Sequence, residues 1–231
     1  MLDKVSSYIS TWWMVMARPV LFFTNVPEGD WREDPLTFAG ITSWVLAFVI
    51  SVVVFIVQQV PIGMRLIEGA TARQMLFASP VLLVFSLAFF AMTLLIAGGV
   101  VLAGVLMMLS ACAMTLHGAL RLLGGKGSLK GMLKAALYCS GALLFAVIPV
   151  IFAIFAKYKL VEMWQLAAIE NIVYYTACLY IWGLFSIAGR KVHDVPRWKA
   201  FLAASVLLVG FILIGIIFHS KVFPKFEKFL I

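Results

Sequence analysis

The sequence predicts an all-α, polytopic membrane protein with five transmembrane helices and short interfacial helices. Forty consecutive residues, 81–120, contain no Asp, Glu, Lys or Arg. Hydrophobic residues make up 64% of the chain and charged residues 12%, against roughly 45–50% and about 25% in soluble domains. The Lys and Arg residues, which give a net charge of +8, lie almost entirely between apolar segments. That distribution is typical of membrane topology, so we expect no nucleic-acid partner.

The amino-terminal region, residues 1–35, is expected to form an interfacial helix followed by a loop. Pro19 should end the helix, because proline cannot continue it, and no secretory signal peptide is expected. An apolar stripe with two tryptophans fits either the headgroup boundary or a face docked on the protein's own core, and both options stay open. The stripe comprises Val5, Tyr8, Ile9, Trp12, Trp13 and Met16.

A five-helix transmembrane domain is expected over residues 36–218. A bilayer's hydrocarbon core is about 30 Å thick and needs about 20 apolar residues per helical crossing. Backbone polar groups in hydrocarbon must be paired within the segment, which favours helices. A further interfacial helix is expected within residues 61–80 and an amphipathic tail over 219–231. The expected spans are 36–57, 81–116, 129–156, 165–187 and 200–218.

The second apolar segment fits either one long helix or two helices that turn at Gly98-Gly99. With five spans and the amino terminus inside, eleven Lys and Arg lie inside and seven outside. If the segment is split into two spans, eight Lys and Arg lie inside and ten lie outside. We therefore predict one long tilted helix and a cytoplasmic amino terminus. Gly98, Gly99 and Gly104 should then be close-approach points for a neighbouring helix.

The joint between the second and third spans reads Leu-Leu-Gly-Gly-Lys-Gly-Ser-Leu-Lys over residues 122–130. Glycines end helices and Ser128 is a good N-cap, so a helix–turn–helix joint is the favoured interpretation. The GxxxxGK[ST] spacing of a nucleotide loop is absent. A lipid-headgroup site is the alternative, because a helix start flanked by lysines attracts phosphate. Its candidate residues are Arg121, Lys126, Ser128 and Lys130.

A few polar residues lie inside the spans and are functional candidates, because burying charge in lipid is expensive. Glu170 and Asn171 lie in the fourth span, and His117 lies near the end of the second. The favoured expectation is that Glu170 pairs with Lys157 or Lys159. In the alternative, Glu170, Asn171 and His117 belong to a polar site for a proton, a cation or a lipid headgroup.

Catalysis, cofactors and metal binding are not expected. The three cysteines, Cys112, Cys139 and Cys178, lie inside apolar segments without CxxC spacing, which is typical of buried free thiols. A metal site needs several His, Cys or carboxylate ligands that converge, and the three histidines are scattered along the sequence. No Ser/His/Asp grouping is expected at one membrane depth, so the sequence does not predict an enzyme.

Several short motifs follow one another in a characteristic order over roughly residues 15–218. They are Pro19, Phe22 and Phe23 before the first span, then Asp34-Pro35-Leu36, the Gly-Gly-Lys-Gly-Ser joint, Tyr138 in the third span, Trp182-Gly183-Leu184 in the fourth, and the basic loop from Val195 to Ala200. In this order they resemble the Yip family, polytopic membrane proteins named for their interaction with Ypt/Rab GTPases. Family members often have a proline soon after the tyrosine, where this chain reads Tyr138-Cys139-Ser140-Gly141.

The resemblance implies five transmembrane helices, a cytoplasmic amino terminus and no catalytic residues. Eukaryotic members carry a long polar amino-terminal region, whereas only about 35 residues precede the first span here, which points to a prokaryotic member in the inner membrane. We therefore expect a membrane scaffold or adaptor that acts through protein partners, self-association and membrane lipids. The alternative is a transporter, channel or lipid-moving protein with a polar path near Glu170, Asn171 and His117.

Overall fold

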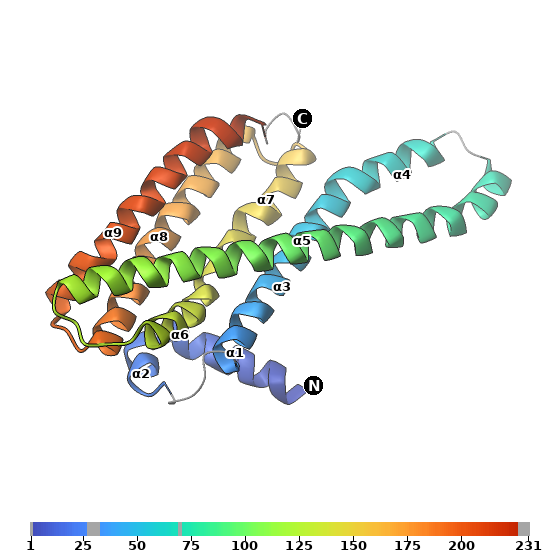
Figure 1. Ribbon diagram of the computed structural model, residues 1–231. Helices are drawn as coiled ribbons and strands as arrows, with labels where there is room; N and C mark the ends of the chain where they lie inside the picture. Colours follow the sequence, from blue (N-terminus) through green and yellow to red (C-terminus); the bar gives the residue numbers. More distant parts are fainter. Residues whose placement is uncertain (1, 27–32, 69–70, 226–231) are drawn as a thin grey trace.

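The computed structural model describes residues 2–26, 33–68 and 71–225 (Figure 1). Within these residues, five helical segments are long and apolar enough to cross a membrane. The predicted fold class, an all-α polytopic membrane protein, is confirmed. The five segments are Asp34–Arg65, Ser79–Leu122, Leu129–Lys157, Met163–His193 and Arg197–Lys225.

Two short helices precede the first span. Helix α1, Leu2–Ala17, ends just before Pro19 as predicted, because Arg18 takes a non-helical conformation ahead of the proline. The loop expected from Pro19 onward was wrong, since α2 occupies Pro19–Thr24. Proline is well tolerated at the first position of a helix, where its missing N–H has no partner to lose. The rest of the expected loop includes residues 27–32, which lie outside the described residues.

The first span is longer than predicted. Helix α3, Asp34–Val54, continues through a π-helical turn, Phe55–Gln59, into α4, Val60–Ile67. Residues 61–67, in the region expected to hold a separate interfacial helix, therefore prolong the span, and the residues from Ala72 onward begin the second span itself. Pro61 has no N–H to donate to the carbonyl one turn earlier, and the wider π-helical turn accommodates this without ending the helix.

The second span is one continuous helix, α5, which extends over Ala72–Leu122. The prediction that the second apolar segment forms one long helix, and not two, is thus confirmed. Its apolar part of 44 residues is roughly 66 Å long at 1.5 Å per residue, more than twice the thickness of the hydrocarbon core. Such a helix must tilt strongly. Figure 1 shows α5 crossing the other spans obliquely, with its amino-terminal part extending past them.

Only one of the three glycines expected to allow close helix approach does so among the described residues. A Cβ added at Gly98 would lie 2.6 Å from the ring of Trp44 on α3. Gly99 and Gly104 have nothing within 4 Å of an added Cβ, so that expectation was wrong for them. The cause is the register of α5, which turns Gly98 towards α3 and leaves the other two exposed.

The third span contains a change of helix type. Helix α6, Leu129–Cys139, passes into a 3₁₀ segment, Ser140–Ala146, and then into α7, Val147–Lys157. The 3₁₀ segment begins at Ser140, two residues after Tyr138. The chain therefore interrupts regular α-helix here without a proline.

The last two spans, α8 (Met163–His193) and α9 (Arg197–Ile217), pack against each other. A π-helical turn, Phe218–Val222, prolongs α9. Part of the expected amphipathic tail, residues 226–231, lies outside the described residues. The described chain begins and ends at opposite ends of the bundle in Figure 1, as an odd number of crossings requires.

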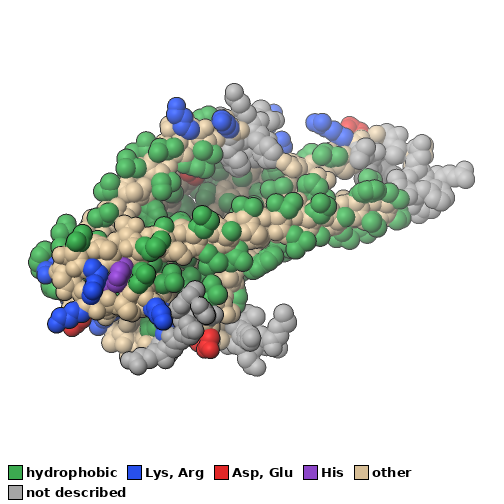
Figure 2. Space-filling view, viewed as in Figure 1, with side chains coloured by type: hydrophobic (Ala, Val, Ile, Leu, Met, Phe, Trp, Pro, Cys, Tyr) green, Lys and Arg blue, Asp and Glu red, His purple; other side chains and the backbone are tan. Residues whose placement is uncertain are grey.

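The core lies where α5, α6 and α8 meet, and its largest fully buried side chains are Leu116, Leu120, Met132, Leu137 and Phe185. The three cysteines are buried free thiols, as predicted. Figure 2 shows hydrophobic side chains covering α5 and the flanks of the bundle, whereas Lys and Arg gather at its two ends. One of these ends carries most of the candidate site residues.

Candidate functional site

The glycine-rich joint closes α5 with a Schellman motif. The Gly125 N–H donates to the Leu120 carbonyl at 2.8 Å, and the Gly124 N–H donates to the Arg121 carbonyl at 3.1 Å. Gly124 has φ +88°, the left-handed conformation that this motif places after the helix cap. The sequence therefore predicted the helix end correctly, because cap chemistry is local.

The joint is also fastened to the end of α8. The Lys126 N–H donates to the His193 carbonyl at 3.2 Å. A Cβ added at Gly127 would lie 2.2 Å from the Val192 carbonyl oxygen, and one added at Gly125 would lie 2.8 Å from His193 Nδ1. Gly127 thus lies against the backbone of α8 and Gly125 against the His193 side chain, a role of the two glycines that the sequence spacing did not reveal.

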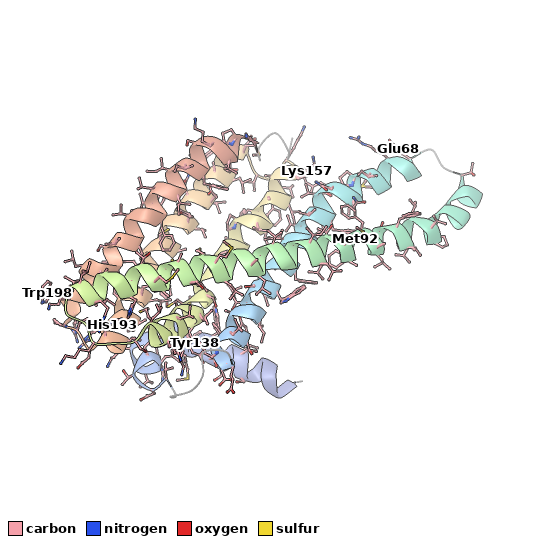
Figure 3. The ribbon with its side chains drawn as sticks, viewed as in Figure 1. Glu68, Met92, Tyr138, Lys157, His193 and Trp198 are labelled. Atoms are coloured by element: carbon pink, nitrogen blue, oxygen red, sulfur yellow. The ribbon has the colours of Figure 1, made fainter. Side chains whose placement is uncertain are left out.

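The start of α9 completes the joint. Lys199 Nζ donates to the Leu123 carbonyl at 2.7 Å, which satisfies one of the acceptors left at the end of α5. The same ammonium lies 5.6 Å from the centroid of the Trp198 ring. Three segments far apart in the sequence thus meet at one end of the bundle, where Figure 3 places both His193 and Trp198.

Two histidines lie at the centre of this end. His117 Nδ1 on α5 lies 3.1 Å from His193 Nε2 on α8, so one ring nitrogen donates and the other accepts. The His193 side chain is only 1% exposed, and its Nδ1 has no hydrogen-bond partner among the described residues. The sequence predicts no such pair, because His117 and His193 lie 76 residues apart in the chain. The structure corrects this by pairing His117 with His193.

Close packing of α5 on α8 makes the pair possible. A Cβ added at Gly189, one turn before His193, would lie 2.8 Å from the Leu120 side chain. A larger residue at Gly189 would therefore push the two helices apart. Leu116 and Leu120 are fully buried beside this contact.

Three of the four candidate residues of the lipid-headgroup site, Lys126, Ser128 and Lys130, belong to the joint, and Arg121 lies directly before it in α5. Ser128 caps α6, because its Oγ accepts the Gly131 N–H at 3.1 Å, as predicted. Arg121 Nη1 donates to the Gly125 carbonyl at 3.4 Å. Lys126 and Lys130 are exposed. The serine thus has a structural role, whereas the lysines face outwards.

Glu170 lies in a different environment from the one expected. The sequence-based expectation named Lys157 or Lys159, but the structure places Glu170 Oε2 3.6 Å from His219 Nδ1 of the π-helical turn after α9. Asn171 Nδ2 donates to the Ala167 carbonyl of its own helix at 2.9 Å. His219 was not predictable as a partner of Glu170, because only the packing of α9 on α8 brings the two residues together.

The structure does not bring Glu170 and His117 together. His117 contacts His193, which lies 23 residues after Glu170 on α8, roughly 35 Å away at 1.5 Å per residue. The alternative polar site that grouped Glu170, Asn171 and His117 is therefore divided between opposite ends of one helix.

Hydrogen bonds hold α1 against the same half of the bundle. Trp12 Nε1 donates to the Gly141 carbonyl in the 3₁₀ segment at 3.1 Å, and the Tyr180 hydroxyl donates to the Met16 carbonyl. Tyr8 donates to Thr42 Oγ1 at 2.9 Å, because the Thr42 proton goes to the carbonyl one turn back. Burial raises the pKa of Tyr8, so its hydroxyl keeps the proton that this bond needs.

The apolar stripe of α1 divides between two environments. Tyr8, Trp12 and Met16 pack against the core, whereas the Ile9 and Trp13 side chains are 58% and 61% exposed. The option of a face docked on the protein is therefore confirmed for part of the stripe. The exposed part fits the headgroup boundary, where tryptophan is favoured.

Within the described part of the chain, no three His, Cys, Asp or Glu side chains converge as metal ligands would. The fold and the basic joint together define an all-α polytopic membrane protein whose second, third, fourth and fifth spans are tied at one end.

The family model of the Yip1 domain matches residues 13–218, from the last part of α1 to the residue after α9. The chain therefore belongs to the Yip family. Searches of curated proteins and of solved structures give no match.

Proposed function

We propose that this Yip protein is an integral membrane scaffold or adaptor that acts through protein partners, self-association and membrane organisation. The main support is that four of the five buried Ser and Thr side chains among the described residues are bonded within their own helix, whereas Ser140 Oγ has no hydrogen-bond partner there. Thr42, Ser43, Ser51 and Ser186 each donate to the carbonyl four residues earlier in their own helix. A path for ions or polar solutes needs polar groups that face a shared space between helices, and these hydroxyls are turned back onto their helices.

The transport alternative has weaker support. Its two polar contacts, Glu170 with His219 and His117 with His193, lie at opposite ends of α8. An open groove lies between α3 and α5, and its lining is apolar, which suits an acyl chain or another helix better than a polar solute. The groove is lined by Ile41, Trp44, Val45, Phe48 and Leu94.

The α5 arm, which we define as the amino-terminal half of the apolar part of this helix, residues 79–100, is the surface that partner proteins would contact. Its apolar side chains Phe85, Met92 and Val100 are among the most exposed in the chain. In a membrane, an apolar arm of this kind meets lipid, another protein or a second copy of the chain. A scaffold uses the last two contacts, which need close helix packing because lipid already satisfies apolar surface.

We propose no catalytic activity, and the Yip family is not known as an enzyme family. The amino-terminal helix and the basic joint pack on the same half of the bundle, so the positive-inside rule would place both in the cytoplasm. The prokaryotic inner membrane stays the predicted location.

Flux measurements in sealed vesicles test the scaffold against the transporter. Purified protein is reconstituted, and proton, cation and labelled-lipid movement is compared with that of protein-free vesicles. We expect no added flux, and none for Glu170→Gln. Flux that the wild type supports and Glu170→Gln abolishes would overturn the scaffold proposal.

Photo-crosslinking in native membranes tests the scaffold directly. A photoreactive residue at exposed Met92 should form adducts of defined mass with a protein partner or a second copy. The same residue at buried Leu137 is the control and should form no intermolecular adduct. Lipid adducts alone at Met92 would contradict a role of the α5 arm in protein assembly.

A further inference from the structure

We propose that the basic joint is a docking surface for anionic phospholipid headgroups of the adjoining leaflet. Three exposed cations meet there from different parts of the chain. Lys126 lies in the joint, Lys130 lies in the first turn of α6, and Arg197 begins α9. Lys199 ties the joint to the first turn of α9. The shared end of the bundle thus presents positive charge from two helix starts and a loop.

Apolar side chains stand among these cations and face outwards. Leu122 is 90% exposed, Trp198 is 61% exposed and Leu129 is also exposed. In water, the exposure of this apolar surface would be energetically unfavourable. At the headgroup boundary, tryptophan and leucine reach the acyl region while lysine and arginine reach the phosphates. The combination of both kinds of side chain therefore favours a lipid surface over a soluble acidic partner.

The joint holds its cations on a fixed backbone. The Schellman motif, the bond from the Lys126 N–H to the His193 carbonyl and the bond from Lys199 to the Leu123 carbonyl together fix its path. A surface that is ordered before binding loses less conformational freedom when it binds. In a mobile basic loop, by contrast, the positive charges would indicate only the side of the membrane on which the loop lies.

The local charge balance agrees with an anionic partner. Among the described residues, Asp194 at the end of α8 is an exposed acidic residue beside the joint, and Glu33 and Asp34 at the start of α3 are exposed acidic residues of the same half of the bundle. The joint and the described helix ends beside it carry five exposed cationic side chains, which are those of Arg121, Lys126, Lys130, Lys191 and Arg197. The attraction between basic side chains and an anionic leaflet falls off within about a Debye length. A cluster of cations at the depth of the headgroups is therefore close enough to bind them.

Electron spin resonance with spin-labelled lipids measures the effect in bilayers of phosphatidylcholine and phosphatidylglycerol. The test variant carries Lys126→Gln, Lys130→Gln and Arg197→Gln. The control removes the same charge from the opposite end with Lys159→Gln, Lys221→Gln and Lys225→Gln. We expect wild type and control to enrich phosphatidylglycerol, and the test variant to lose about five-fold in selectivity, the effect of one fully effective charge.

Each other result contradicts the proposal. No selectivity in the wild type, or equal losses in both variants, would show that this end has no special role. Inorganic phosphate, added at constant ionic strength, should leave the selectivity unchanged, and displacement by it would assign the surface to a soluble anion. If the triple variant does not fold, the single variants Lys126→Gln and Arg197→Gln replace it, and unchanged selectivity in both would overturn the proposal.

Discussion

His117 Nδ1 lies 3.1 Å from His193 Nε2, and this contact ties the end of the second span to the end of the fourth. The His193 carbonyl meanwhile accepts the Lys126 N–H, so one residue joins α5, α8 and the loop between α5 and α6. The His193 side chain is buried beneath Gly125, where only glycine leaves room for it. The histidine pair is therefore the central contact of the basic end.

Removing one imidazole should destabilise the bundle. In His117→Ala, the His193 ring loses its only hydrogen-bond partner among the described residues, and a buried polar group without a partner costs about 1–3 kcal/mol. Thermal or chemical unfolding in detergent micelles would measure the loss. His193→Ala and the double variant complete a cycle, and a coupling energy near zero would show that the two rings do not interact.

Alanine at Gly127 should disturb the joint. The new Cβ would lie 2.2 Å from the Val192 carbonyl oxygen, so the loop or the end of α8 must move, at about 1–3 kcal/mol. Gly99→Ala is the control, since nothing lies within 4 Å of its added Cβ. We expect Gly99→Ala to be neutral or up to about 1 kcal/mol more stable, because alanine is the better helix former. Equal melting temperatures for the two variants would refute this description of the joint.

A second pair of glycines tests the packing of α9 on α8. A Cβ at Gly215 would lie 2.3 Å from the Tyr174 ring, whereas Gly210 in the same helix has open space. Gly215→Ala should therefore lower the free energy of unfolding by about 1–3 kcal/mol, and Gly210→Ala should not. If Gly210→Ala proves the more harmful of the two, the register of α9 on α8 is wrong.

The docking of α1 depends on one tryptophan more than on its neighbour. Trp12→Phe removes the bond to the Gly141 carbonyl and should cost about 1 kcal/mol, with faster hydrogen exchange in residues 7–24. Trp13→Phe changes an exposed side chain and should leave that exchange unchanged. The opposite ranking would mean that the stripe docks on the protein through its other edge.

Local features of the sequence predicted the spans and the helix ends. Apolar length identified the five crossings, and residue chemistry identified the Ser128 cap and the glycine end of α5. Contacts between spans were not predictable in this way. Lipid and protein interior are both apolar, so the pattern of hydrophobic residues does not tell which face of a span meets a neighbour. His193 and His219 were missed, and Gly99 was assigned a contact that it does not make, for this reason.

Five helices of the described chain are long and apolar enough to cross the membrane, and we propose that the joint after α5 lies in the cytoplasm and the turn after α7 lies outside. Single-cysteine variants at Lys126 and Lys159, made in a chain without Cys112, Cys139 and Cys178, test it with a membrane-impermeant thiol reagent. We expect Lys159→Cys to be labelled in intact cells and Lys126→Cys to be labelled only after permeabilisation. Labelling of both positions from the same side would contradict the five-span topology.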